Sequence, residues 1–161
     1  VVARPTDLNA LITSVIDVEL KRYEGEPVEI VSELAADLPK IQADHAQIMQ
    51  VLVNLIENAV DAMPQGGRVV VRTLKEPPAM VTIEIEDNGT GIPPEDLKKL
   101  FTPFFTTKPI GKGTGLGLPI VYGIVKMHRG QVMVRSEVNQ GTRFIIQLPV
   151  KLLGITSNQQ G

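Results

Sequence analysis

The strongest constraint on the fold of this chain is a long helical repeat of apolar side chains between Asp44 and Met63. The repeat has the spacing of one helix face, with apolar residues at Ile48, Val51, Leu52, Leu55, Ile56, Ala59 and Val60. So wide a stripe predicts a helix that begins at Asp44, buries most of one side and ends before Pro64. Such a helix needs other elements to cover it, so the chain must form a layered core around it.

Other patterns predict the layers around that helix. Helical spacing also runs from Thr6 to about Tyr23, with Thr6 or Asp7 as the cap, and from Leu116 to His128. Strand patterns occur at Val28–Leu34, Lys40–Ala43, Arg68–Leu74, Met80–Glu86, Gln131–Ser136 and Thr142–Pro149. The last four form two hairpins, so we expect an α+β fold, a two-layer α/β sandwich with the helices on one face. Residues 1–150 would form the domain and residues 151–161 a polar tail.

Composition excludes several function classes. With 16 basic against 18 acidic residues, the net charge of −2 argues against nonspecific binding to nucleic acid. The absence of cysteine excludes disulfides, a thiolate nucleophile and a cysteine-based zinc site. No signal peptide and no apolar run of about 18 residues is present, so we expect a cytoplasmic domain without membrane contact. The start at VVARPTDLN, without methionine, is typical of a domain cut from a longer protein.

Two glycine-rich segments flank a long loop that contains a short helical piece at Pro94–Leu100. Asp87-Asn88-Gly89-Thr90-Gly91-Ile92-Pro93 follows a strand, and Gly111-Lys112-Gly113-Thr114-Gly115-Leu116-Gly117-Leu118 leads into a helix. Glycines before a helix N-terminus let backbone N–H groups approach a phosphate closely, although an ordinary flexible loop is the alternative. The spacing fits neither a P-loop nor a Rossmann fingerprint.

Two asparagines, Asn54 and Asn58, lie one turn apart on the long helix, with Asp61 on the same side. Asparagine is unfavourable inside a helix and needs partners when it is buried. The pair therefore indicates either a ligand or metal, or a hydrogen-bonded pair within the core.

Taken together, these segments resemble the ATP-binding catalytic domain of two-component sensor histidine kinases. That family belongs to a superfamily with gyrase, a heat-shock chaperone and the mismatch-repair ATPase MutL. Asn54–Asn58 resembles the N box, Asp87–Gly91 the first glycine box, Phe101–Lys108 (FTPFFTTK) the F box and Gly113–Gly117 the second glycine box. The resemblance covers about residues 6–150 and is strongest to the sensors of nitrogen status and of dicarboxylates. It implies a Bergerat-type fold, with three helices on one face of a mixed, mostly antiparallel five-stranded sheet.

The resemblance implies that the cofactors are ATP and Mg²⁺. Asp87 would accept a hydrogen bond from the adenine amine, which guanine cannot donate at that position. Asn58 would coordinate Mg²⁺, supported by Asn54 and Glu57 in the catalytic centre. The remaining residues expected around the nucleotide are Asp61, Gly89, Gly91, Ile92, Phe104, Thr107, Lys108, Lys112, Gly113, Thr114, Gly115, Leu116, Gly117 and Leu118.

Some of these residues keep a simpler alternative. Lys108 and Lys112 either neutralise phosphate charge or are ordinary solvated lysines. Phe101, Phe104 and Phe105 either anchor the loop to the core or couple its position to the nucleotide and a partner domain.

Neither histidine has the following acidic residue that marks the phosphoacceptor of a histidine kinase. His45 lies near a helix start, and His128 at a helix end, where a positive charge would suit the helix dipole. The resemblance therefore implies an N-terminal dimerisation and phosphoacceptor domain outside this chain, and a downstream response regulator. The chain alone should be a monomer.

The alternatives are an ATP-hydrolysing relative and a nucleotide-binding interaction module. Hydrolysing relatives carry a glutamate where this chain has Asn54, and an amide cannot act as a general base, so hydrolysis should be slow. A serine-directed kinase of the anti-sigma-factor type would differ only in its acceptor.

Overall fold

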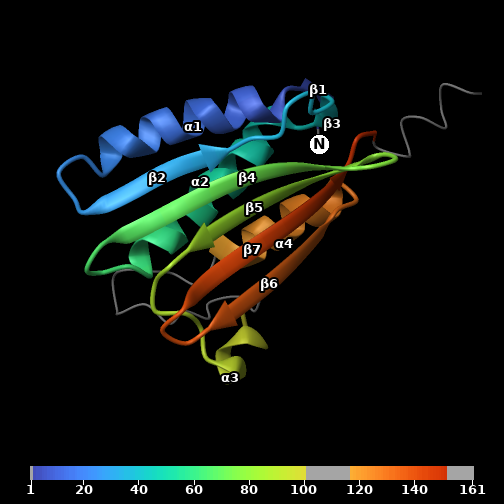
Figure 1. The fold of residues 1–161 in the computed structure, drawn as a ribbon. Coiled ribbons are helices and arrows are strands. Elements are labelled where there is room, and N and C mark those ends of the chain that lie inside the picture. Colours follow the sequence, from blue (N-terminus) through green and yellow to red (C-terminus); the bar gives the residue numbers. More distant parts are fainter. Residues whose placement is uncertain (1, 101–116, 152–161) are drawn as a thin grey trace, which may run out of the picture.

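The computed structural model describes residues 2–100 and 117–151 (Figure 1). Its helices and strands follow the order β1 (Arg4–Thr6), α1 (Leu8–Arg22), β2 (Val28–Glu33), β3 (Ile41–Ala43), α2 (His45–Asp61), β4 (Gly67–Glu76), β5 (Met80–Asp87), α3 (Pro94–Leu97), α4 (Gly117–Met127), β6 (Gln131–Glu137) and β7 (Gly141–Pro149). The expected α+β class is confirmed. The expected helical piece at Pro94–Leu100 is shorter than predicted, since α3 ends at Leu97.

The main sheet has the order β2-β4-β5-β7-β6. β2 pairs in parallel with β4, and every other neighbouring pair in this sheet is antiparallel. This is the mixed, mostly antiparallel five-stranded sheet that the resemblance implies. A second sheet of two strands, β1 and β3, was not predicted, because the three residues of β1 are too short to show an alternating pattern.

Helices α1, α2 and α4 cover one face of the main sheet, with α2 between the other two (Figure 1). The apolar stripe of α2 is buried along its whole length, as its spacing predicts. Two of the three long helices that the sequence predicts begin with a capping carboxylate: Asp7 accepts from the Ala10 N–H at 3.1 Å, and Asp44 accepts from the Gln47 N–H at 3.2 Å. The core therefore lies between the sheet and these helices, and α2 is its centre.

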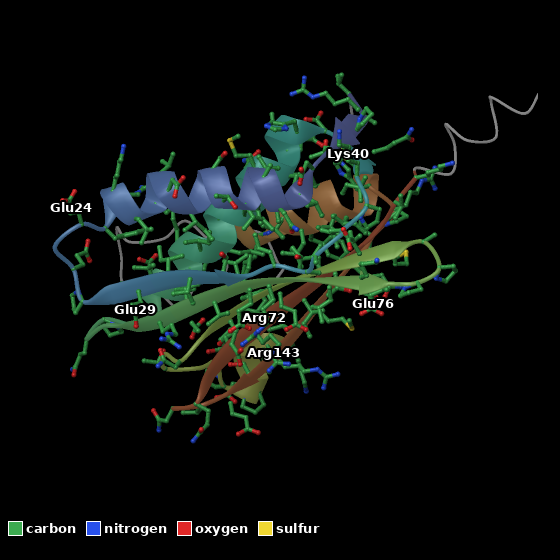
Figure 2. The ribbon with its side chains drawn as sticks, turned by 45° about the horizontal axis from the view of Figure 1, so that its top comes forward. Glu24, Glu29, Lys40, Arg72, Glu76 and Arg143 are labelled. Atoms are coloured by element: carbon green, nitrogen blue, oxygen red, sulfur yellow. The ribbon has the colours of Figure 1, made fainter. Side chains whose placement is uncertain are left out.

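The opposite face of the sheet carries charged side chains, among them Arg72 and Arg143 (Figure 2). Arg72 donates to Glu33 of β2 at 2.8 Å and to Glu86 of β5 at 2.6 Å, and Arg143 of β7 donates to Glu86 at 3.2 Å. The hydrogen bond from Arg72, followed by that from Arg143, lowers the pKa of the Glu86 carboxyl. Opposite charges on adjacent strands thus link four strands on the face that the helices leave open.

One sequence interpretation needs correction. His128 does not face solvent at the end of α4, because only 1% of the residue is exposed and both ring nitrogens are engaged. Nε2 accepts from the Asp44 N–H at 2.9 Å, and Nδ1 lies 2.8 Å from the Ile124 carbonyl oxygen, to which it must donate. This pair of partners fits the neutral ring. His128 is a structural residue that joins the end of α4 to the start of α2.

Within the described ranges, no helix has the length and apolar character needed to cross a membrane.

Candidate nucleotide site

The site is built around Asp87, the last residue of β5. Side-chain alternation directs Asp87 to the helix-bearing side of the sheet, where only 6% of the residue remains exposed. Its Oδ1 accepts from the Gly89 N–H at 2.9 Å. Burial raises the pKa of the Asp87 carboxyl, and hydrogen bonds from the backbone of Gly89 and Thr142 oppose that rise. The result is a buried acceptor held in place by its own loop.

The loop after Asp87 is held on two sides. The Thr90 N–H donates to the Ala62 carbonyl, the C-cap of α2, at 2.9 Å, while the Thr90 carbonyl accepts from the Asn139 N–H at 2.7 Å. The Ile92 N–H donates to Ser136 Oγ of β6 at 2.8 Å. The predicted loop residue Ile92 is therefore a fixed anchor between the end of β5 and the β6–β7 hairpin.

Two glycines in this loop are required by its close packing. A Cβ at Gly89 would collide with the Ala62 carbonyl oxygen of α2. Gly91 has φ +75°, and a Cβ there would collide with the Glu137 carbonyl oxygen. The glycines that the sequence singled out thus let the loop lie directly against the end of α2 and the β6–β7 turn.

The polar residues of α2 face two different directions. Asn54 and Asn58 are partly buried, and Asp61, at the end of the helix, is exposed. Glu57 points toward α1, where its Oε2 lies 2.5 Å from Arg22 Nη1. Adjacent residues on a helix point about 100° apart, so Glu57 and Asn58 present their side chains to different neighbours. Glu57 thus contacts α1. Asn58 lies shortly before Ala62 in the sequence, and Ala62 is the residue that contacts Thr90.

The Arg22–Glu57 pair belongs to a charged cluster between α1 and α2 that the sequence analysis missed. Glu19 of α1 is buried, and Arg22 Nη1 is 3.9 Å from its Oε2. Burial, and then the nearby Glu57 charge, raises the pKa of Glu19. Burial and the same carboxylates raise the pKa of Tyr23 to about 12. The only signal in the sequence was a glutamate at an apolar-stripe position of the first helix.

The second glycine box and the F box fall largely outside the described residues. The predicted site residues that lie outside the described residues are Phe104, Thr107, Lys108, Lys112, Gly113, Thr114, Gly115 and Leu116. Gly117 begins α4, and Leu118 packs against the core.

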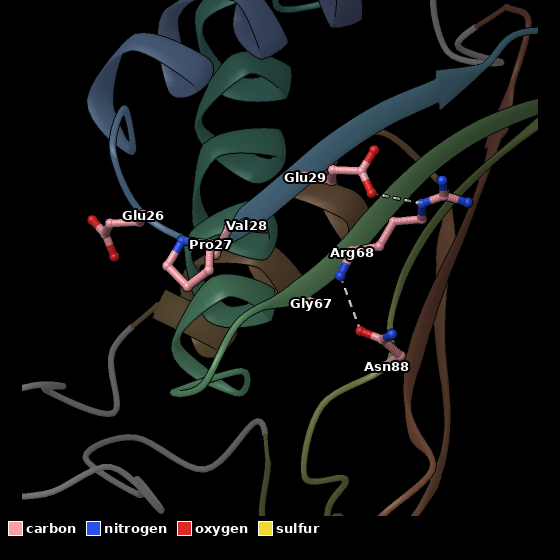
Figure 3. A pocket seen from close by; sticks show the side chains of 7 residues that line it. All are labelled: Glu26, Pro27, Val28, Glu29, Gly67, Arg68 and Asn88. Atoms are coloured by element: carbon pink, nitrogen blue, oxygen red, sulfur yellow. Dashed lines mark hydrogen bonds and ion pairs between the residues drawn. The ribbon is translucent and has the colours of Figure 1, made fainter.

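A cavity of about 630 Å³ lies beside the Asp87 loop (Figure 3). It is lined by Glu26, Pro27, Val28, Glu29, Gly67, Arg68 and Asn88. Asn88 Oδ1 accepts from the Arg68 N–H at 3.0 Å, so this residue joins the loop to the start of β4. Of the predicted nucleotide-binding residues that the structure describes, none lines this cavity.

The geometry agrees with comparisons to known proteins. Residues 43–152 match the family described as "Histidine kinase-, DNA gyrase B-, and HSP90-like ATPase". The match covers more than half of the chain. The chain belongs to this family.

Similar family members include named sensor kinases. Sensor kinase CckA of Brucella abortus is 46% identical over 144 residues, which cover 81% of this chain and 15% of that protein. Sensor histidine kinase ZraS of Escherichia coli strain K12 is 39% identical over 146 residues, which cover 91% of this chain and 31% of that protein. The chain thus spans a minor part of the length of these relatives. Both names agree with the predicted relationship to sensor histidine kinases.

Solved structures confirm the fold. The nucleotide-free catalytic domain of histidine kinase ThkA has a TM-score of 0.84 at 30% identity, with 94% of this chain and 97% of that chain covered. Full-length ShkA in complex with AMPPNP has a TM-score of 0.82 at 29% identity, with 91% of this chain and 31% of that chain covered. ThkA in complex with the response regulator TrrA has a TM-score of 0.78 at 28% identity, with coverage of 92% and 42%. The closer relationship to nitrogen and dicarboxylate sensors stays a prediction.

Proposed function

We propose that this family member binds Mg·ATP and transfers the γ-phosphoryl group to a histidine on a separate dimerisation and phosphoacceptor domain. The observation that carries the proposal is the buried carboxylate of Asp87, held by a glycine loop that is hydrogen-bonded to the end of α2. The names of CckA and ZraS, and the AMPPNP complex of ShkA, support it.

Asp87 selects the base in this proposal. Its carboxylate accepts a hydrogen bond from the exocyclic amine of adenine, and the loop glycines, by packing against Ala62 and Glu137, hold the loop that carries this carboxylate. Guanine presents an oxygen at the equivalent position, so two acceptors would face each other in a buried site. Such an unpaired contact discriminates strongly, because neither group can turn to water.

Asn58 is the proposed protein ligand of the metal. In the described part of the chain, no three His, Cys, Asp or Glu residues converge into a cation site. An amide oxygen on α2 fits Mg²⁺, which takes oxygen ligands, keeps several waters and relies on substrate phosphates. When bound, the ion would neutralise phosphate charge. Asn54 would support this centre. The Glu57 carboxylate accepts a hydrogen bond from Arg22 of α1.

Neither described histidine fits the role of phosphoacceptor. His128 is buried with both ring nitrogens hydrogen-bonded, and His45 is the first residue of α2, followed by Ala46. The acceptor histidine is therefore proposed to lie on another domain, with a response regulator as the next partner. We also propose that this domain is a monomer by itself and works in the cytoplasm, where ATP is available.

A transfer assay tests this function. The chain is incubated with γ-labelled ATP and a purified dimerisation domain that carries a phosphoacceptor histidine. We expect acid-labile label on the added domain, and its loss in Asn58→Ala. Label released mainly as free phosphate would instead favour a hydrolysing relative, against the amide at Asn54.

A further inference from the structure

An ion pair joins α1 to the part of α2 that bears the proposed metal ligand. Arg22 Nη1 of α1 lies 2.5 Å from Glu57 Oε2, and Glu57 directly precedes Asn58. The pair is formed between residues 35 positions apart in sequence, so it fixes one helix against the other rather than stabilising a single helix.

Two further groups lie near the Arg22 guanidinium. The buried carboxyl of Glu19 lies 3.9 Å away on the side of α1, and neither of its oxygens has a hydrogen-bond partner among the described residues. The guanidinium also lies 5.9 Å from the centre of the Tyr23 ring. Arg22 therefore lies between two carboxylates from different helices, and its removal would leave them facing each other without a cation.

The C-terminal end of α2 is held by the loop that follows Asp87. The Ala62 carbonyl accepts from the Thr90 N–H, and Gly89 packs against that carbonyl. The end of α2 is thus fixed by α1 through Glu57 and by the Asp87 loop through Ala62. Asn58 lies between these two attachment points in sequence. Asp87, in contrast, is anchored by Gly89 and Thr142 and has no link to Arg22 among the hydrogen bonds and ion pairs of the described residues.

We propose that Arg22 is a positioning residue for the metal site, which acts by holding Glu57 from α1 and so fixes the turn of α2 that presents Asn58. This inference rests on the proposed function. Its consequence is selective: loss of Arg22 weakens the metal-dependent part of nucleotide binding and leaves the recognition of adenine by Asp87 intact. A residue that only stabilised the two helices would not separate these two parts.

Calorimetric titration of the 161-residue chain with ADP, in Mg²⁺ and in EDTA, tests the proposal. The variants are Arg22→Gln, Arg22→Lys and Glu57→Gln. The matched control is Arg68→Gln, because Arg68 is 56% exposed like Arg22 and pairs with Glu29 on the neighbouring strand at 3.5 Å. Circular dichroism and the thermal midpoint report whether each variant folds. If Arg22→Gln does not fold, Glu57→Gln tests the same ion pair.

We expect Arg22→Gln and Glu57→Gln to bind ADP about fivefold more weakly in Mg²⁺ and unchanged in EDTA, as suits a partly exposed charged pair. Arg22→Lys should recover most of the affinity, and Arg68→Gln should behave as wild type. Equal losses in Mg²⁺ and EDTA, no loss at all, or the same loss in Arg68→Gln would overturn the inference alone. A wild-type chain that binds no adenine nucleotide would overturn the proposed function together with it.

Discussion

The ring of His128 accepts a hydrogen bond from the backbone N–H of Asp44 at 2.9 Å, across 84 residues of sequence. Asp44 is the N-cap of α2, and its carboxylate also accepts from the backbone N–H groups of Val2 and Gln47. These two hydrogen bonds lower the pKa of the Asp44 carboxyl. A single buried imidazole thus connects the end of α4 with the start of the central helix.

Replacement of this imidazole should destabilise the fold. His128→Leu leaves the Asp44 N–H and the Ile124 carbonyl without their partner in a buried place, which should lower the free energy of unfolding by about 2–4 kcal/mol. Urea denaturation measures this loss. His45→Leu is the control, since His45 is only partly buried, and its effect should stay within about 1 kcal/mol. Equal losses in both variants would contradict the structural role of His128.

Gly89→Ala should disrupt the Asp87 loop. The added Cβ meets the Ala62 carbonyl, which belongs to backbone and cannot swing aside, so the loop must shift away from α2. We expect adenine nucleotide affinity to fall by at least about tenfold. Gly123→Ala is the matched control, because nothing lies within 4 Å of a Cβ there on α4, and it should raise stability by roughly 1 kcal/mol. Binding by Gly89→Ala at the wild-type level would show that the loop tolerates the shift.

Glu19 should make stability depend on pH. Its pKa is raised above the ordinary 4.5 in the folded chain, so between the unfolded and the folded pKa the native state binds more protons than the unfolded state. Stability contributed by that proton is present below the unfolded pKa and is lost as pH rises through the folded pKa. Glu19→Gln should therefore gain stability relative to wild type over the pH range from below 4.5 to well above it. Denaturation midpoints at both ends of this range measure the gain, and a constant difference would contradict it.

Local patterns were sufficient to predict much of this fold. Neighbouring residues alone indicate the apolar stripe of α2, its start at Asp44 and the strand pattern of β5, and each lies where the sequence predicts it. The link between His128 and Asp44 and the pair between Arg22 and Glu57 were missed, because each joins residues that only the tertiary fold brings together. The β1 strand was missed because its three residues are too few to show an alternating pattern.

The central claim is that Asp87 recognises adenine. Calorimetric titration with ATP, ADP and GTP, on wild type and on Asp87→Asn, tests it most directly. We expect wild type to bind both adenine nucleotides, to bind GTP at least about tenfold more weakly, and to lose this preference with most of its affinity in Asp87→Asn. Because burial raises the pKa of Asp87, adenine binding should also weaken as pH falls through that raised value. Equal binding of ATP and GTP by wild type, or full adenine affinity in Asp87→Asn, would contradict the account.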